Sequence, residues 1–135
     1  MYNFLVIVLS KRIEMKLAII AHDGKKADMV AFLQEHKEFL LKQSVELVAT
    51  GTTGSHVERA GLEVQKVASG PLGGDAQIAA MVTEGKIQAV IFFRDPMDKH
   101  PHEPDIAMLM RICDVHNVPL ATNQATARYI IEGLR

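Results

Sequence analysis

Short apolar runs alternate with longer amphipathic stretches from residue 16 to the end of the chain. The apolar runs, which predict strands, are 17–21, 45–49, 64–67, 87–93 and 118–121. The stretches between them, which are typical of helices, are 25–42, 54–60, 74–85, 105–116 and 124–132. Strands that are apolar throughout and separated by helices are typical of a parallel sheet covered on both faces. The pattern predicts a single doubly wound α/β domain: a five-stranded parallel sheet flanked by helices.

The first fourteen residues do not fit this alternation. Residues 2–9 are apolar but too few to span a bilayer. The basic residues Lys11 and Arg12 follow this run, whereas a secretory signal places them before it. A second methionine, Met15, stands directly before the first strand. We therefore expect a domain over 15–135, a non-native or mis-started extension over 1–14 without a role in function, and a cytoplasmic location.

Composition narrows the class of partner. The 135 residues suit one domain, and 15 Lys and Arg balance 16 Asp and Glu. This balance argues against nucleic acid or an anionic membrane as the main partner. The single cysteine, Cys113, excludes an intrachain disulfide and lies on one predicted helix stripe with Ile106, Leu109 and Met110. We expect a buried core thiol, not a nucleophile.

Unusual polar residues follow the predicted strands, where loops of a parallel sheet converge on a ligand. They are His22, Asp23, Lys25 and Lys26 after the first strand, 50–54 after the second and 69–75 after the third; Arg94, Asp95 and 100–105 follow the fourth, and Thr122 and Asn123 the fifth. Structural caps alone would be scattered over both edges of the sheet. The clustering predicts a binding site at the carboxyl edge.

Two of these segments are suited to an anion. The segment from Thr50 to Gly54 combines three threonines with two glycines, and Ser69-Gly70 adds a second hydroxyl-rich turn. Backbone N–H groups, hydroxyls and the charge of Lys26 are the donors that a phosphate requires. A capped β-to-α turn fits the threonine segment equally well, and for Lys26 taken alone a solvated helix start fits better; Lys26 becomes a phosphate ligand only together with the two hydroxyl-rich segments. Neither nucleotide-binding glycine pattern is present, so a nucleotide is not expected.

Asp75 is the candidate for acid–base chemistry. It follows Gly73 and Gly74 at the start of a predicted helix, where it would cap the helix or interact with its dipole, or else act as a general base in a dry pocket. An unperturbed aspartate is a poor base at neutral pH. The second role therefore requires burial that raises its pKa.

His102 is the second candidate for the site. It lies between Pro101 and Pro104, which restrict the loop and could aim the imidazole, although an exposed loop histidine fits as well. Asp105 would cap the next helix or support a catalytic neighbour. His100, His102 and Asp105 do not form a recognised metal motif, so no metal is expected.

Together, these segments resemble the methylglyoxal synthase family over residues 15–135. The resemblance is carried by His22-Asp23, Lys26, 50–54, 69–75, 93–96, 101–105 and 121–123. The runs Gly73-Gly74-Asp75 and 101–105 are specific, whereas the threonine segment alone would not be.

The resemblance implies conversion of dihydroxyacetone phosphate to methylglyoxal and inorganic phosphate, without a metal or an organic cofactor. It places Asp75, His102 and Asp105 at catalytic positions. The implied substrate contacts are His22, Lys26, Thr50, Gly51, Thr52, Thr53, Ser69, Gly70 and His102, and the supporting acids are Asp23 and Asp95. It also implies a homohexamer in which phosphate is a product and an allosteric inhibitor.

The chemistry agrees with this assignment. Removal of a proton next to a carbonyl forms an enediolate, whose oxygen a neutral His102, helped by His22, would stabilise. Two alternatives come from the same superfamily. A regulatory anion-binding domain would need no base, and a cyclohydrolase domain of purine synthesis is normally fused to a second domain. The presence of Asp75, His102 and Asp105 favours the enzyme.

Overall fold

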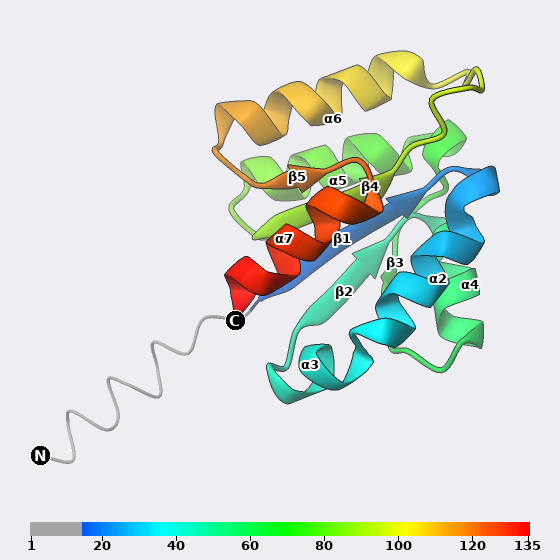
Figure 1. Cartoon of the computed structure of the whole chain (residues 1–135). Helices are drawn as coiled ribbons and strands as arrows, with labels where there is room; N and C mark the ends of the chain where they lie inside the picture. Colours follow the sequence, from blue (N-terminus) through cyan, green and yellow to red (C-terminus); the bar gives the residue numbers. More distant parts are fainter. Residues whose placement is uncertain (1–14) are drawn as a thin grey trace, which may run out of the picture.

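A computed structural model of the chain describes residues 15–135; the expectations for residues 1–14 lie outside this range. It contains a parallel sheet in the order β3-β2-β1-β4-β5 (Figure 1). The strands are β1 (Lys16–Ala21), β2 (Glu46–Ala49), β3 (Gln65–Lys66), β4 (Ala89–Phe93) and β5 (Leu120–Ala121). The doubly wound α/β class predicted from the sequence is confirmed.

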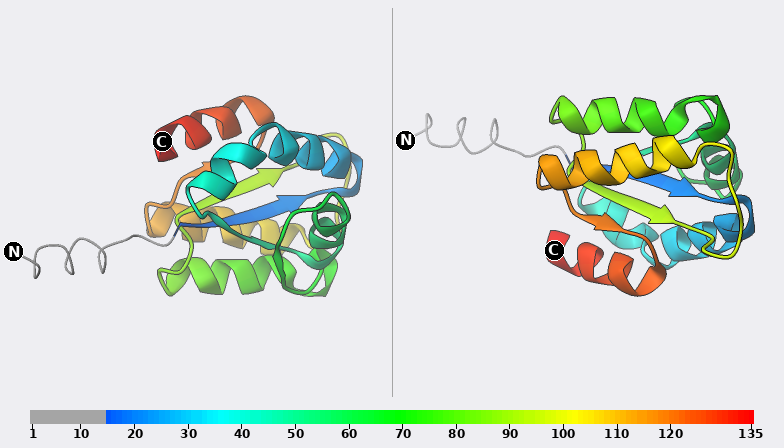
Figure 2. Two further views of the ribbon diagram at one scale, coloured as in Figure 1. Left: turned by 90° about the horizontal axis from the view of Figure 1, so that it is seen from below. Right: turned by 90° about the horizontal axis from the view of Figure 1, so that it is seen from above.

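Helices cover both faces of the sheet. They are α2 (Lys26–Glu35), α3 (Lys37–Lys42), α4 (Gly51–Arg59), α5 (Gly74–Thr83), α6 (Glu103–Val115) and α7 (Gln124–Leu134), with 3-10 turns η1 (Asp23–Lys25) and η2 (Gly70–Leu72). The views in Figures 1 and 2 show α5 and α6 together on one face and α2, α3 and α7 on the other. Two separate layers of apolar side chains therefore hold the domain together.

Alternation along β1 explains the two layers. Leu17 and Ile19 pack with the layer under α2 and α7, whereas Ala18 and Ile20 pack with α5 and α6. Successive side chains of a strand point to opposite faces, so a strand buried on both faces is apolar throughout. Cys113 lies fully buried in the second layer, and burial raises the pKa of its thiol to about 11. The expectation of a core thiol is confirmed.

Several helix boundaries differ from those predicted. The region 25–42 is divided at His36, whose backbone departs from helical angles. The helix α4 begins at Gly51 instead of residue 54, so the threonine segment forms its first turn rather than a loop. The helix α6 begins at Glu103 instead of residue 105. Polar residues around glycine and proline obscured both starts, because propensity alone favours turns there.

The strand order determines where a ligand can bind. From β1 the chain adds β2 and β3 on one side, and it then adds β4 and β5 on the other. Such a reversal opens a crevice at the carboxyl ends of the two central strands. In this protein those strands are β1 and β4, which end at Ala21 and Phe93. Among residues 15–135, no helix is both long and apolar enough to cross a membrane.

Candidate active site

His22 stands at the reversal point, directly after β1. Its backbone N–H donates to the carbonyl of Phe93 at 3.2 Å, which extends the pairing of β1 with β4. Its ring Nδ1 accepts a hydrogen bond from the backbone N–H of Asp95 at 2.9 Å. A neutral ring that accepts at Nδ1 carries its proton on Nε2. His22 is therefore arranged to donate through Nε2, an atom that is buried and has no partner within residues 15–135.

Three histidines meet at this point. The rings of His22 and His100 are stacked, with centroids 3.5 Å apart and planes 19° apart. His102 approaches His22 edge-on at 6.0 Å. Burial is the main cause that lowers the pKa of His22 to about 4, and the charges of His100, His102 and Arg94 add to this effect against the opposing charge of Asp95. His22 is thus neutral at physiological pH.

Asp75 is the second residue of α5 and is fully buried. The turn before it requires glycine: Gly73 has φ +99°, and a Cβ on Gly74 would come within 1.9 Å of the Ala68 carbonyl oxygen. Neither carboxylate oxygen of Asp75 has a hydrogen-bond partner in the described part of the chain. The interpretation of Asp75 as a helix cap is therefore wrong, because Gly73 is the N-cap and no side chain caps the helix.

Burial also sets the protonation of Asp75. Desolvation is the main cause that raises its pKa, and the nearby charge of Asp105 acts in the same direction, whereas His102 and His100 lower it. The Oδ2 atom of Asp75 lies 3.6 Å from Nε2 of His102, too far for a hydrogen bond but close enough for a charge interaction. An unpaired carboxylate in a dry environment has the raised basicity that a general base requires.

His102 is the N-cap residue of α6, and Asp105 is the third residue of that helix. The backbone N–H groups of Asp105 and Ile106 donate to the carbonyl of His102 at 3.0 and 3.1 Å. Asp105 is therefore not the helix cap that the sequence suggested. The start of α6 holds His102 against η2, where a Cβ on Gly70 would lie 2.8 Å from Nε2 of His102 and 3.4 Å from Oδ1 of Asp75.

A second group of polar residues gathers around the carbonyl of Ala21. The ammonium of Lys26 donates to this oxygen at 3.1 Å and to Oδ1 of Asp23 at 2.5 Å. The Thr53 hydroxyl donates to the same carbonyl at 3.2 Å and accepts from the Ala21 N–H. Lys26 and the first turn of α4 are therefore neighbours. The proton of the Thr53 hydroxyl is already used within the protein, so only its backbone N–H remains for an anion.

The first turn of α4 lies against the segment that carries Ser69. The N–H of Gly51 donates to the Ala68 carbonyl at 3.2 Å, and the Thr50 hydroxyl donates to Thr53 at 3.3 Å. The first N–H groups of a helix have no partner inside it, which leaves those of Thr52 and Thr53 as donors at its positive end. These groups form a second cluster, which consists of Lys26, Thr50, Gly51, Thr52, Thr53 and Ser69. The strand β1 and the turn η2 connect it to the first cluster, which consists of His22, Asp75, His100 and His102.

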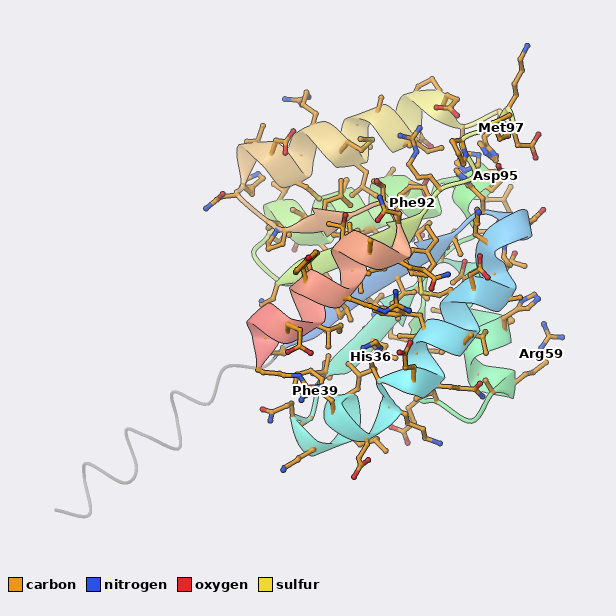
Figure 3. The ribbon with its side chains drawn as sticks, in the orientation of Figure 1. His36, Phe39, Arg59, Phe92, Asp95 and Met97 are labelled. Carbon is orange, nitrogen blue, oxygen red and sulfur yellow. The ribbon has the colours of Figure 1, made fainter. Side chains whose placement is uncertain are left out.

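The two supporting acids lie at the border of the site. The Asp23 side chain is 97% exposed and is paired with Lys26, which lowers its pKa. Oδ1 of Asp95 accepts from the N–H of Met97 at 3.1 Å. Figure 3 shows Asp95 and Met97 together beyond the end of β4. Both carboxylates hold loop geometry, and neither lies among the buried unpaired atoms.

The sequence placed His100 and Arg94 at the carboxyl edge but assigned neither of them a role in the site. The only role considered for His100 was that of a metal ligand, yet its ring stacks on His22. The Nε atom of Arg94 is buried without a partner in the described residues, and its guanidinium lies 3.9 Å from Glu103. The His-Pro-His spacing of 100–102 was the available signal. Its meaning depended on the contact with β1, which no local pattern reveals.

Two other properties of the structure bear on the chemistry. Among residues 15–135, no group of three or more His, Cys, Asp or Glu side chains is arranged to hold a metal ion. Two hollows of about 360 and 1090 Å³ lie near α3 and along the edge of β3, and neither is lined by the residues described above. The unpaired buried polar atoms, and not the hollows, mark the site, because buried groups left without partners concentrate where a protein binds or reacts.

The chain is similar in sequence to proteins of one known family. The family model described as MGS-like domain matches residues 28–122. A methylglyoxal synthase of Carboxydothermus hydrogenoformans is 56% identical over 121 residues, which are 89% of this chain and 98% of the relative. Another, of Moorella thermoacetica, is 58% identical over 122 residues, 90% of this chain and 94% of the relative.

A solved structure supports the same conclusion. The crystal structure of methylglyoxal synthase from Elizabethkingia anophelis superimposes with a TM-score of 0.81 at 45% sequence identity, covering 87% of this chain and 77% of that chain. The match extends over most of both chains, so the relationship concerns the whole domain and not a shared motif. The chain therefore belongs to the methylglyoxal synthase family.

Proposed function

We propose that this protein is a methylglyoxal synthase, a carbon–oxygen lyase that converts dihydroxyacetone phosphate to methylglyoxal and inorganic phosphate. The observation that carries the proposal is the fully buried carboxylate of Asp75, unpaired within the described residues and 3.6 Å from His102. Membership of the family supports the substrate, and the arrangement around Asp75 supports the chemistry.

In the first step, Asp75 takes a proton from the hydroxymethyl carbon beside the substrate carbonyl. The electron pair of the broken C–H bond forms a C=C bond, and the carbonyl oxygen becomes an enediolate oxygen. His102 and the neutral His22 stabilise that oxygen, His22 through the proton on Nε2. Donors fixed in a water-poor site stabilise such charge more than water does.

Before the second step, the hydroxyl on the deprotonated carbon gives up its proton and the former carbonyl oxygen takes one, a transfer for which His102 is placed. The new oxyanion then forms the aldehyde C=O bond, the C=C bond shifts to the methylene carbon, and the ester C–O bond breaks with its electron pair leaving on the phosphate. The resulting enol of methylglyoxal takes a proton on its methylene carbon and loses its hydroxyl proton. For this elimination, the ester bond must lie out of the enediolate plane. We assign the phosphate to Lys26, the positive end of α4, Ser69 and Gly70, because this second cluster lies beside Asp75 and His102 and offers donors from three connections.

Asp105 and the supporting acids complete the proposal. Asp105 raises the pKa of Asp75 through its charge and holds the start of α6, on which His102 sits. Asp23 fixes the ammonium of Lys26, and Asp95 fixes the ring of His22 through its backbone. We also propose, from family membership, a homohexamer in the cytoplasm that phosphate inhibits. Light scattering of the purified protein, and kinetics with added phosphate, test these properties.

The decisive experiment incubates the purified protein with dihydroxyacetone phosphate and measures methylglyoxal and phosphate together. We expect equal amounts of both products, with no requirement for added metal or cofactor. Saturable binding of a phosphate analogue without turnover would refute the enzyme and favour a regulatory anion-binding domain.

A further inference from the structure

His100 is a half-buried residue of the connection between β4 and α6. Its ring covers one face of the His22 imidazole at 3.5 Å, with the planes 19° apart. The same ring meets His102 at 5.8 Å and 63°, and its Nε2 atom is buried without a partner within residues 15–135. None of the roles assigned above uses this side chain.

Three contacts hold the His22 ring. The Asp95 N–H binds one edge at Nδ1, Phe92 packs edge-on with centroids 5.1 Å apart, and His100 stacks on a face. One hydrogen bond at an edge restrains a ring position but still allows the ring to tilt about that bond. A ring stacked face to face at 3.5 Å removes this freedom, because any tilt would bring atoms of the two rings closer than van der Waals contact. His100 is therefore the contact that sets the ring plane.

We propose that His100 is a positioning residue, which holds the His22 ring in the plane that presents its Nε2–H to the substrate oxygen. The substrate and reaction belong to the function proposed above, but the effect of His100 on the His22 ring does not depend on them. The charged and titratable groups that act on His22 are His100, His102, Arg94 and Asp95. Loss of the His100 ring removes one of the three charged groups that lower the pKa of His22.

The test compares His100→Val, which removes the stack, with His100→Phe, which keeps an aromatic ring but has no nitrogen. His116→Val, at the end of α6, is the matched control away from the site. With dihydroxyacetone phosphate, we expect His100→Val to lower kcat about tenfold at nearly constant KM, because a small misplacement of a catalytic group costs on this order. We expect His100→Phe to recover most of the loss, to within about threefold of the parent.

Nitrogen-15 NMR of histidine-labelled protein provides a readout that is independent of turnover. The chain has six histidines, so the spectrum is simple. We expect the His22 signals of the parent and of His100→Phe to show a neutral Nε2–H ring at pH 6. In His100→Val, we expect mixed tautomers and a His22 titration that begins at higher pH. Thermal unfolding checks each variant, and His100→Gln replaces His100→Val if the latter does not fold.

Several outcomes would overturn the proposal. Parental kcat and an unchanged His22 spectrum in His100→Val would show that the stack does nothing. Equal damage in His100→Phe and His100→Val would mean that the nitrogens of His100 matter and the stack does not. A parent protein that fails to turn over dihydroxyacetone phosphate, but whose His22 spectrum still depends on the His100 ring, would refute only the function proposed above.

Discussion

The carboxyl and amino ends of the sheet differ in whether their buried polar groups have hydrogen-bond partners. At the carboxyl end, six buried side-chain atoms of His22, Asp75, Arg94, His100 and His102 have no partner within residues 15–135. At the other end, Nδ1 of His36 lies 2.9 Å from the Phe32 carbonyl, and its ring packs on Phe32 at 4.5 Å. Figure 3 shows Asp95 and Met97 at the first end and His36 and Phe39 toward the second.

The comparison shows why shape alone misidentifies the site. The hollow of about 360 Å³ at the amino end is lined by Glu35, His36, Phe39, Arg135 and their neighbours. Three of the polar lining residues have partners: Glu35 pairs with Arg128 at 3.6 Å, Nδ1 of His36 lies 2.9 Å from the Phe32 carbonyl, and Arg135 lies over Phe39. A buried polar group without a partner destabilises the fold, so it is retained where function requires it. Unpaired atoms mark the carboxyl end, not the hollow.

The largest effect is expected from Asp75→Asn. Loss of the base should lower kcat by about 10³-fold or more with KM nearly unchanged. Because the buried carboxylate loses its unfavourable charge, Tm should rise, by roughly 3–5 °C for each kcal/mol gained. The control His36→Gln should do the reverse, keeping kcat and losing about 1 kcal/mol with its hydrogen bond. Activity assays and thermal unfolding of both variants test these two expectations. A lower Tm in Asp75→Asn would contradict the conclusion that the unpaired carboxylate destabilises the fold.

The next effect is expected at Lys26, whose ammonium is largely buried and lies beside α4. Lys26→Met should reduce kcat/KM by about 10- to 100-fold, because a charge-assisted hydrogen bond contributes about 1.5–3 kcal/mol. The matched control, Lys42→Met, removes an exposed lysine beside the amino-end hollow and should have no effect on kinetics. Steady-state kinetics distinguish the two, and equal losses would show a general charge effect instead of a phosphate contact.

A third effect concerns acid stability. The pKa of His22 is about 4 in the folded protein and about 6.5 when unfolded. Between these two pH values, His22 is protonated in the unfolded chain but not in the folded chain. The free energy of unfolding therefore decreases as pH falls from about 6.5 to 4. Relative to His22→Gln, the parent should lose about 3 kcal/mol of unfolding free energy over this window.

Urea unfolding of parent and His22→Gln at pH 7.5, 5.5 and 4 measures this difference. The comparison with the variant is needed because Asp75 has a raised pKa and acts in the opposite direction: its buried charge destabilises the fold as pH rises. A difference that stays constant across the three pH values would show that His22 is not held neutral.

The smallest effects distinguish two glycines. A Cβ on Gly70 would lie 2.8 Å from the His102 ring, whereas one on Gly133 in α7 meets nothing within 4 Å. Gly70→Ala should displace His102 and lower kcat about tenfold with little change in Tm. Gly133→Ala should keep kcat and add about 0.5 kcal/mol of stability, because alanine favours helix. A loss of activity in Gly133→Ala, or an unchanged activity in Gly70→Ala, would show that the two ends of the sheet do not differ in this way.

Much of the site was predictable from the sequence, and the reason is topological. A parallel sheet brings every carboxyl-terminal loop to one edge, so Lys26, Thr50, Ser69, Asp75 and His102 were predicted as neighbours without knowledge of their contacts. The helix starts were less predictable. Gly51 and Glu103 begin α4 and α6 because tertiary contacts, such as the Gly51 bond to Ala68, override weak local propensity.

The amino-acid sequence by itself determined the alternation of strands and helices, the buried Cys113 and the cluster of polar residues at one edge, because these follow from periodicity and strand order. Only the tertiary structure decided three other properties. Asp75 is unpaired instead of capping α5, the Thr53 hydroxyl is bound to Ala21, and His100 is stacked on His22. Each of these properties depends on a contact between residues that are far apart in the chain, or on the rotamer of a side chain. The local spacing of residues in the sequence determines neither the contact nor the rotamer.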